Sequence, residues 1–191
     1  IGRLAKDGVD YKNIAILYRT NAQSRIFEEK FMIKNIPYRI VGGTNFYQRK
    51  EVKDVICYLK AVDNGLDDLA VKRIINVPRR GIGATTIDKV QTYAIEQNIG
   101  FLDACFQARQ IESLANAKRK IEKFSELIAD FREQAQKGSL EDLFHYILEE
   151  TGYVTGLEAE GTEEAMARIE NINELLNKIV AYEETAEEPT L

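Results

Sequence analysis

The chain has 191 residues, of which 45% are hydrophobic and 30% are charged, a balance typical of a globular protein. No apolar run reaches the length that crosses a membrane, and no secretory signal pattern is visible. The only cysteines, Cys57 and Cys105, lie in apolar helical patterns, and the only histidine, His145, has no ligand residues at metal-binding spacing. We therefore expect reduced cysteines, a cytoplasmic protein and no metal site.

The net charge of −5 is unevenly distributed along the chain. Residues 1–109 hold 18 Lys and Arg against 12 Asp and Glu, a net charge of +6, whereas the remainder holds 8 against 19, a net charge of −11. A basic half can hold phosphates, and an acidic half repels them except at local patches. We take the change near residues 107–114 as a junction between two domains, 1–110 and 111–191.

The first strong pattern is a continuous apolar run, Ile14-Ala15-Ile16-Leu17-Tyr18, typical of a parallel strand that is covered on both faces. Asn21 is a suitable N-cap for a helix that runs to about Lys34, and Tyr38–Val41 forms a second short strand before Gly42-Gly43. The predicted fold class is therefore mixed and mainly α, with a small β-α-β remnant of a parallel sheet followed by an all-α domain. Two strands are too few to stand alone, so we expect the rest of the sheet outside this fragment or from dimerisation.

Tyr18 and Arg19 follow the first predicted strand directly. Ligands of open α/β sheets bind just beyond the carboxyl ends of the strands. An aromatic ring can stack on a base, and a guanidinium can reach a phosphate, so the pair suits a nucleotide. The alternative is a tyrosine packed on the sheet and an arginine in solvent.

Beyond Gly43 the pattern is helical throughout. Pro78 ends one helix, and Ser139 with Asp142 resembles a capping box that has Asp in place of Glu. The apolar periodicity and these end signals predict helices at residues 52–62, from 67 or 68 to 77, 84–97, 101–107, 115–137, 140–150 and 163–184.

The best nucleic-acid candidate is the segment Arg79-Arg80-Gly81-Ile82-Gly83-Ala84-Thr85-Thr86. Two arginines precede a Gly-x-Gly turn, and glycine lets backbone approach backbone or phosphate closely. The following helix start exposes N–H groups, and Thr85 and Thr86 add hydroxyls, so we predict contact with a DNA backbone. The alternative is a plain turn between helices with solvated arginines.

Three further segments have a structural and a functional interpretation. Thr151-Gly152-Tyr153 is a second glycine turn, which makes Gly152 and Tyr153 candidates for DNA contact or parts of an ordinary turn. Phe46 and Tyr47 are expected to anchor the helix that begins near Arg49. Arg168-Ile169-Glu170-Asn171 sits inside a helix, where hydrogen bonding between helices is expected rather than ligand binding.

Several blocks in one order resemble the PcrA/UvrD-type DNA helicases of superfamily 1. The chain segment from Ile16 to Arg25 is similar to motif IV of that family. The resemblance continues through residues 36–43, 46–54, 58–59, 76–83 and 168–171.

The resemblance implies two RecA-like motor lobes, each with a helical insertion. ATP and Mg²⁺ lie between the lobes, and single-stranded DNA crosses their top. Residues 1–110 would begin the second lobe, and 111–191 would form part of its helical insertion. The 191 residues contain no G-x-x-x-x-G-K-[ST] phosphate loop, so we expect a fragment without ATPase activity that needs the first motor lobe.

The family assigns roles to residues at matching positions. Tyr18 would stack on adenine, and Arg19 would be the catalytic arginine finger at the nucleotide. Glycine turns such as 81–83 and 151–153 would face duplex or junction DNA. The resulting prediction is a piece of a bacterial 3′-to-5′ helicase of DNA repair and replication, with repair proteins as further partners. The alternative is a non-catalytic DNA-binding or protein-interaction module of a repair complex, or a lobe of a helicase-nuclease relative.

Overall fold

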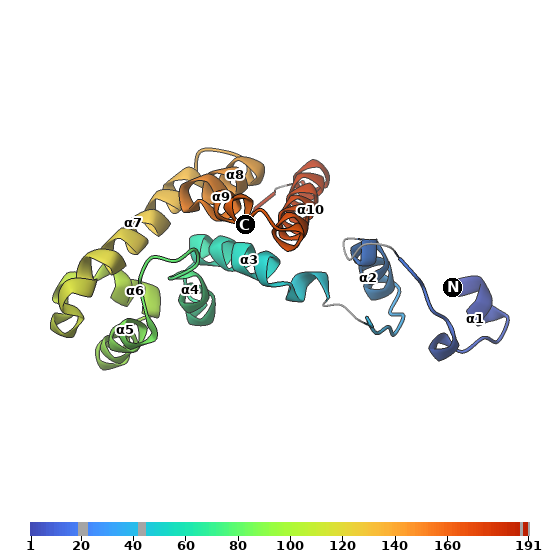
Figure 1. Ribbon diagram of the computed structural model, residues 1–191, viewed down its shortest axis with the longest axis horizontal. Coiled ribbons are helices and arrows are strands. Elements are labelled where there is room, and N and C mark those ends of the chain that lie inside the picture. Colours follow the sequence, from blue (N-terminus) through green and yellow to red (C-terminus); the bar gives the residue numbers. More distant parts are fainter. Residues whose placement is uncertain (19–22, 42–44, 188, 191) are drawn as a thin grey trace.

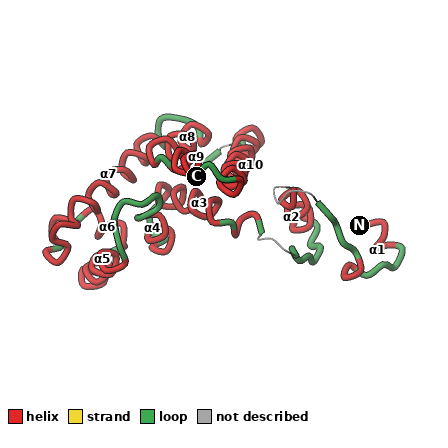
Figure 2. Tube along the Cα trace, viewed as in Figure 1, coloured by secondary structure: helices red, strands yellow, loops and turns green. Residues whose placement is uncertain are grey.

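The computed structural model describes residues 1–18, 23–41, 45–187 and 189–190, and Figures 1 and 2 show helices joined by short loops over this part of the chain. Short 3₁₀ turns lie at Tyr11–Asn13 (η1), Phe46–Gln48 (η3), Ala108–Gln110 (η4) and Glu112–Ala117 (η5). The α-helices are α1 Gly2–Lys6, α2 Ser24–Ile33, α3 Lys50–Asp63, α4 Asp68–Ile74, α5 Ala84–Gln97, α6 Phe101–Phe106, α7 Lys118–Gln134, α8 Leu140–Thr151, α9 Tyr153–Glu160 and α10 Glu163–Thr185.

The predicted β-α-β unit is wrong, because no strand is present among the described residues. Residues 14–18 and 36–41 run as loops on either side of α2 (Figure 2), and in both of them half-buried and exposed residues alternate along the chain. Alternation is the pattern of a strand with one covered face, but a strand also needs a neighbour that satisfies its N–H and C=O groups. These two segments form no ladder with each other, so no sheet results.

Aromatic contacts hold the two loops against α2. The Tyr18 ring stacks on Phe27 with centroids 6.5 Å apart, and the Tyr38 ring contacts Phe31 with centroids 5.5 Å apart. The loops and α2 together line a groove of about 890 Å³. Leu17 is 96% exposed, which shows that one face of the first loop is uncovered.

Helices α3 to α10 form a body with two buried apolar clusters that meet at α3. One cluster joins α3 to α4, α5, α6, α7 and α8, and the other joins η3 and α3 to α8, α9 and α10. Both clusters are close-packed around large side chains, which make burial of apolar surface the main stabilising term for this part of the chain. Their largest fully buried members include Phe46, Tyr58, Phe101, Phe124, Phe131 and Phe144.

Local end signals start α4, α5 and α8 at their predicted positions, whereas α4 ends at Ile74, before the predicted end at residue 77, and α7 covers Lys118–Gln134 in place of the predicted 115–137. The Asp67 carboxylate accepts from the Ala70 N–H at 3.0 Å and caps α4, and Ser139 and Asp142 form the predicted capping box at the start of α8. The bounds of α5 are the predicted ones. The sequence analysis missed α9, which begins directly after the left-handed Gly152.

Helices on both sides of residue 110 share one apolar cluster. α6 packs on α7. Arg132 of α7 donates to the carbonyl oxygens of Ala61 and Val62 at 3.0 and 3.1 Å, and so provides hydrogen-bond donors to free carbonyls in the last turn of α3. The assignment of 1–110 and 111–191 to two domains stays a prediction.

The N-terminal part meets the body through polar groups. In Figure 1, α10 is the body helix that faces α2. Arg25 and Glu29 of α2 form ion pairs with Glu174 and Lys178 of α10, at 2.6 and 2.5 Å. Neither apolar cluster contains a described residue before Phe46. Within the described residues, none of the helices combines the length and apolar character needed to cross a bilayer.

Candidate nucleic-acid interface

The turn at residues 76–83 is held in one shape by Asn76 and Ile82. The Asn76 side-chain oxygen accepts from the backbone N–H groups of Arg80 and Ile82, at 2.8 and 3.1 Å. The Ile82 side chain is 1% exposed and belongs to the larger apolar cluster. The isoleucine of the Gly-Ile-Gly sequence therefore anchors the turn, while the two glycines beside it lie on the surface.

The two glycines have different roles in the turn. Gly81 has φ +70°, a conformation that side chains rarely adopt, and a Cβ there would lie 2.8 Å from the Lys120 ammonium. Gly83 is the extended N-cap of α5 and provides no side-chain cap. Nothing lies within 4 Å of a Cβ built on Gly83, so this helix end opens to solvent.

The N-terminus of α5 is exposed and carries free donors. Ala84 and Thr85 are exposed, and their backbone N–H groups have no hydrogen-bond partner in the described part of the chain. Thr86 is half-buried, and its N–H donates to the Gly83 carbonyl at 3.0 Å. Open N–H groups and the helix dipole together favour an anion at this end.

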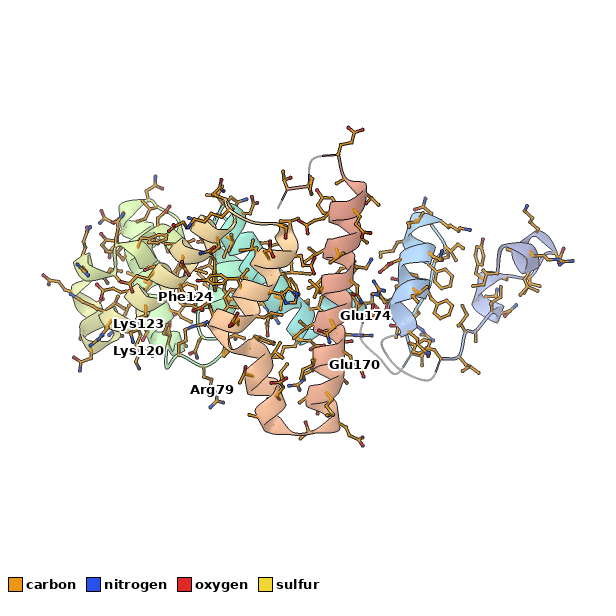
Figure 3. All side chains as sticks on the ribbon, turned by 90° about the horizontal axis from the view of Figure 1, so that it is seen from above. Arg79, Lys120, Lys123, Phe124, Glu170 and Glu174 are labelled. Carbon is orange, nitrogen blue, oxygen red and sulfur yellow. The ribbon has the colours of Figure 1, made fainter. Side chains whose placement is uncertain are left out.

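The two arginines before the turn point in different directions. Arg79 is exposed and projects from the loop in Figure 3. The Arg80 guanidinium points inward and donates to the carbonyl oxygens of Ile74 and Val77, both at 3.0 Å. It also donates to the Tyr58 hydroxyl at 2.6 Å. Arg80 thus satisfies carbonyls at the end of α4, which leaves Arg79 as the outward cation of the pair.

Arg80 is also packed between aromatic rings. Its guanidinium carbon lies 5.9 Å from the Tyr58 ring centroid and 5.7 Å from the Phe124 ring centroid. Burial raises the pKa of the Tyr58 hydroxyl, against the opposing effect of the Arg80 charge. Nothing in the sequence indicates which of two adjacent arginines turns inward, because Tyr58 and Phe124 are distant in the chain.

The second glycine turn places Tyr153 in the smaller apolar cluster, whereas a Cβ built on Gly152 would meet nothing within 4 Å. Gly152 ends α8 at φ +65° and is half-buried, and Tyr153 is 7% exposed. The Tyr153 hydroxyl donates to the Asp54 carboxylate at 2.7 Å, and burial with that carboxylate raises the pKa of Tyr153. This geometry ties α9 to α3. A DNA contact by Gly152 or Tyr153 stays a prediction.

A buried polar network joins three parts of the chain. Arg49 donates to the Asn171 side-chain oxygen and, at 3.1 Å, to the Ser24 hydroxyl. The Asn171 amide donates to Glu51 at 2.6 Å. These contacts confirm the predicted hydrogen bonding between helices for Asn171. Phe46 is 1% exposed, as expected for an anchor, whereas Tyr47, predicted with it, is 37% exposed.

The predicted nucleotide site is only partly described. Tyr18 is half-buried and lines the groove beside α2, stacked on Phe27. Arg19 lies outside the described residues, as do Asn21, Gly42 and Gly43. Among the described side chains, no group of three or more His, Cys, Asp or Glu is arranged to hold a metal ion.

Comparison with known proteins identifies the class. The family model of the UvrD-like helicase C-terminal domain matches residues 1–191, so the chain belongs to that family. The ATP-dependent DNA helicases PcrA of Staphylococcus aureus strains Mu50 and COL are each 42% identical over 179 residues, which cover 94% of this chain and 24% of the relative. PcrA of Staphylococcus epidermidis strain RP62A is 40% identical over 94% of this chain and 25% of the relative. The chain thus spans about a quarter of the length of these relatives.

Proposed function

We propose that this chain is part of an ATP-dependent DNA helicase that moves 3′ to 5′ along single-stranded DNA. Membership in the UvrD-like family supports this proposal, as do relatives that are named as such helicases. In this proposal the missing motor lobe completes the ATP site, and the described helices supply part of the surface that holds DNA.

The proposed DNA contact is inferred mainly from the open N-terminus of α5. Ala84 and Thr85 present free N–H groups at an exposed helix end, and Arg79 lies just before it without an ion pair in the described part of the chain. Charge and N–H donors suit phosphate oxygens, whereas reading bases requires an ordered set of side chains at their edges. The proposed contact is therefore with the DNA backbone and independent of base sequence.

The proposal for the ATP site rests on the family resemblance and on the position of Tyr18. Tyr18 stacks on the adenine, and Arg19 offsets the charge that grows on the transferred phosphoryl group. ATP with its Mg²⁺ would be bound between this lobe and the first one. In the complete helicase, Arg19→Ala should lower kcat by roughly 10³-fold, with a smaller change in ATP affinity, because the charge it offsets grows in the transition state.

The test of the DNA contact places a negative charge at the open helix end. Thr85→Glu in the complete helicase keeps α5 stable, since an acidic residue in the first turn favours the helix, but it repels phosphate. Thr92→Glu adds the same charge at an exposed position farther along α5 and serves as the control. We expect Thr85→Glu to weaken binding similarly on DNAs of different sequence and to flatten the dependence of log K on log salt by about one per lost contact.

If the two glutamate variants bind DNA with equal affinity and equal salt dependence, residues 79–86 are a plain connector between two helices. Weaker binding that depends on base sequence would contradict the backbone contact. A complete protein that binds DNA without hydrolysing ATP in its presence would favour the alternative, a non-catalytic module.

A further inference from the structure

Helix α2 is held at its first turn by residues from other elements. Its N-cap residue, Gln23, makes no side-chain capping hydrogen bond. The Ser24 hydroxyl accepts from the Arg49 guanidinium at 3.1 Å and donates to the Glu28 carboxylate at 2.8 Å. The other oxygen of that carboxylate accepts from the Phe46 N–H at 3.2 Å. The start of α2 is therefore fixed by groups that lie 18 and 25 positions from their partners in the sequence.

These polar groups are buried, so each of them depends on the others. Ser24, Glu28 and Arg49 are 2%, 4% and 8% exposed. A buried polar group that loses its partner is costly, which holds the set in one arrangement. Arg49 also donates to Asn171 of α10, and its guanidinium carbon lies 5.4 Å from the centroid of the Phe46 ring. Because Phe46 belongs to the smaller apolar cluster, Arg49 ties α2 to the core of the body.

A second row of contacts joins α2 to α10. Arg25 pairs with Glu174 at 2.6 Å, and Glu29 pairs with Lys178 at 2.5 Å. Figure 3 shows Glu174 on the side of α10 that faces α2. These four side chains keep between 16% and 31% of their surface exposed, and partly exposed pairs contribute little free energy. They add to the orientation of α2, while the buried contacts at its first turn are the stronger link.

The opposite side of α2 faces the loop that carries Tyr18. At about 100° per residue, Phe27 lies in the sector opposite Arg25 and Glu29. The Tyr18 ring stacks on Phe27 with centroids 6.5 Å apart and planes inclined by 20°. Residues 14–18 form no strand ladder within the described part of the chain, so the Phe27 ring supports Tyr18 directly.

A ring that stacks on a base binds best when it is already in place. A side chain that must be ordered during binding lowers the affinity, because its conformational freedom is lost at that moment. Tyr18 therefore favours binding as far as Phe27 holds it, and Phe27 holds it as far as α2 itself is fixed.

We propose that Arg49 is a positioning residue of the ATP site. It holds the first turn of α2 through Ser24, and α2 holds the Tyr18 ring through Phe27. The body of the chain thus sets the position in which Tyr18 stacks on adenine. This inference rests on the proposed function, in which Tyr18 is the residue that stacks on the base. Arg49 itself needs no contact with the nucleotide.

The test removes single links between Arg49 and Tyr18 in the complete helicase. Ser24→Ala removes an acceptor of Arg49, and Phe27→Ala removes the ring beside Tyr18. Each should weaken binding of a non-hydrolysable ATP analogue, measured by isothermal titration calorimetry, by roughly 2- to 10-fold, the cost of ordering one side chain on binding. Arg49→Ala should act in the same direction, and Arg49→Lys should recover part of the affinity because an ammonium still donates.

A Tyr18→Ala background separates positioning from a general loss of structure. In that background Ser24→Ala and Phe27→Ala should weaken analogue binding no further, because the ring that they position is gone. Asn173→Ala, at an exposed position of α10, is the control and should leave the affinity unchanged. The DNA concentration that half-saturates the ATPase should stay at its wild-type value in Ser24→Ala.

The outcomes separate this inference from the proposed function. If Tyr18→Ala leaves analogue binding unchanged, the proposed adenine contact is wrong and the positioning role is wrong with it. If Tyr18→Ala weakens binding while Ser24→Ala and Arg49→Ala do not, the positioning role alone is wrong. Equal weakening by Ser24→Ala with and without the Tyr18 ring would indicate a general loss of structure and overturn the inference. Ser24→Ala removes a single oxygen, so it decides the test even where Arg49→Ala fails to fold.

Discussion

The two parts of this chain are held together by different forces. The body from η3 to α10 has two apolar clusters built on aromatic side chains that are almost fully buried. The described residues before 42 contribute nothing to those clusters; they are joined to α10 by ion pairs and to Phe46 and Arg49 by hydrogen bonds. Apolar burial is not screened by salt, whereas partly exposed ion pairs are weakened by it. We therefore expect the body to keep its structure at salt concentrations that weaken the contact between α2 and α10.

The largest effect should come from the apolar core. Phe131→Ala removes a side chain with 0% exposure that contacts Tyr58 and Tyr146 edge to face. We expect the free energy of unfolding of the body to fall by about 3–5 kcal/mol, measured by urea denaturation. Phe27→Ala, in α2, is the comparison variant and should leave body unfolding nearly unchanged, because Phe27 belongs to neither cluster. Similar losses for both variants would show that the two parts unfold as one unit.

A smaller effect is expected from the buried polar network at the boundary of the two parts. Asn171→Ala removes the acceptor for Arg49 and the donor to Glu51 and leaves each of them short of one partner. The expected total loss is about 1–3 kcal/mol, because Arg49 keeps its hydrogen bond to the Ser24 hydroxyl. Asn173→Ala on the same helix is exposed and serves as the matched control. If urea midpoints of the two alanine variants coincide, water reaches Arg49 and Glu51 and the network adds little to stability.

The smallest effect concerns the ion pair between α2 and α10. Glu174→Gln removes the carboxylate that pairs with Arg25 at 2.6 Å. Partly exposed pairs contribute about 0.2–1 kcal/mol, so amide hydrogen exchange in α2 should quicken by up to about fivefold while exchange in α7 stays constant. Glu170→Gln, one turn earlier on α10 in Figure 3, is exposed and forms no ion pair with a described residue. Faster exchange in the Glu170 variant alone would contradict the importance of the Arg25 pair.

The sequence predicted most helices because their signals are local. The apolar stripe of α7, the cap at Asp67 and the capping box at Ser139 depend on residues within a few turns of one another. The Gly-Ile-Gly turn could be predicted for the same reason, because its residues are adjacent in the sequence. α9 was missed because the left-handed Gly152 indicates the end of a helix and the short segment after it carries only a weak apolar pattern.

Tertiary structure decided the features that need distant partners. The apolar runs at 14–18 and 38–41 have strand character, but a strand forms only where another backbone completes its ladder. Arg80 and Arg79 are equivalent in the sequence, and Arg80 turns inward because packing places Tyr58, Phe124 and the carbonyls at the end of α4 around it. Lys120 reaches Gly81 because α7 packs beside the turn. Local sequence thus set where helices begin and end, while packing between distant segments determined which charged groups remain exposed at the surface.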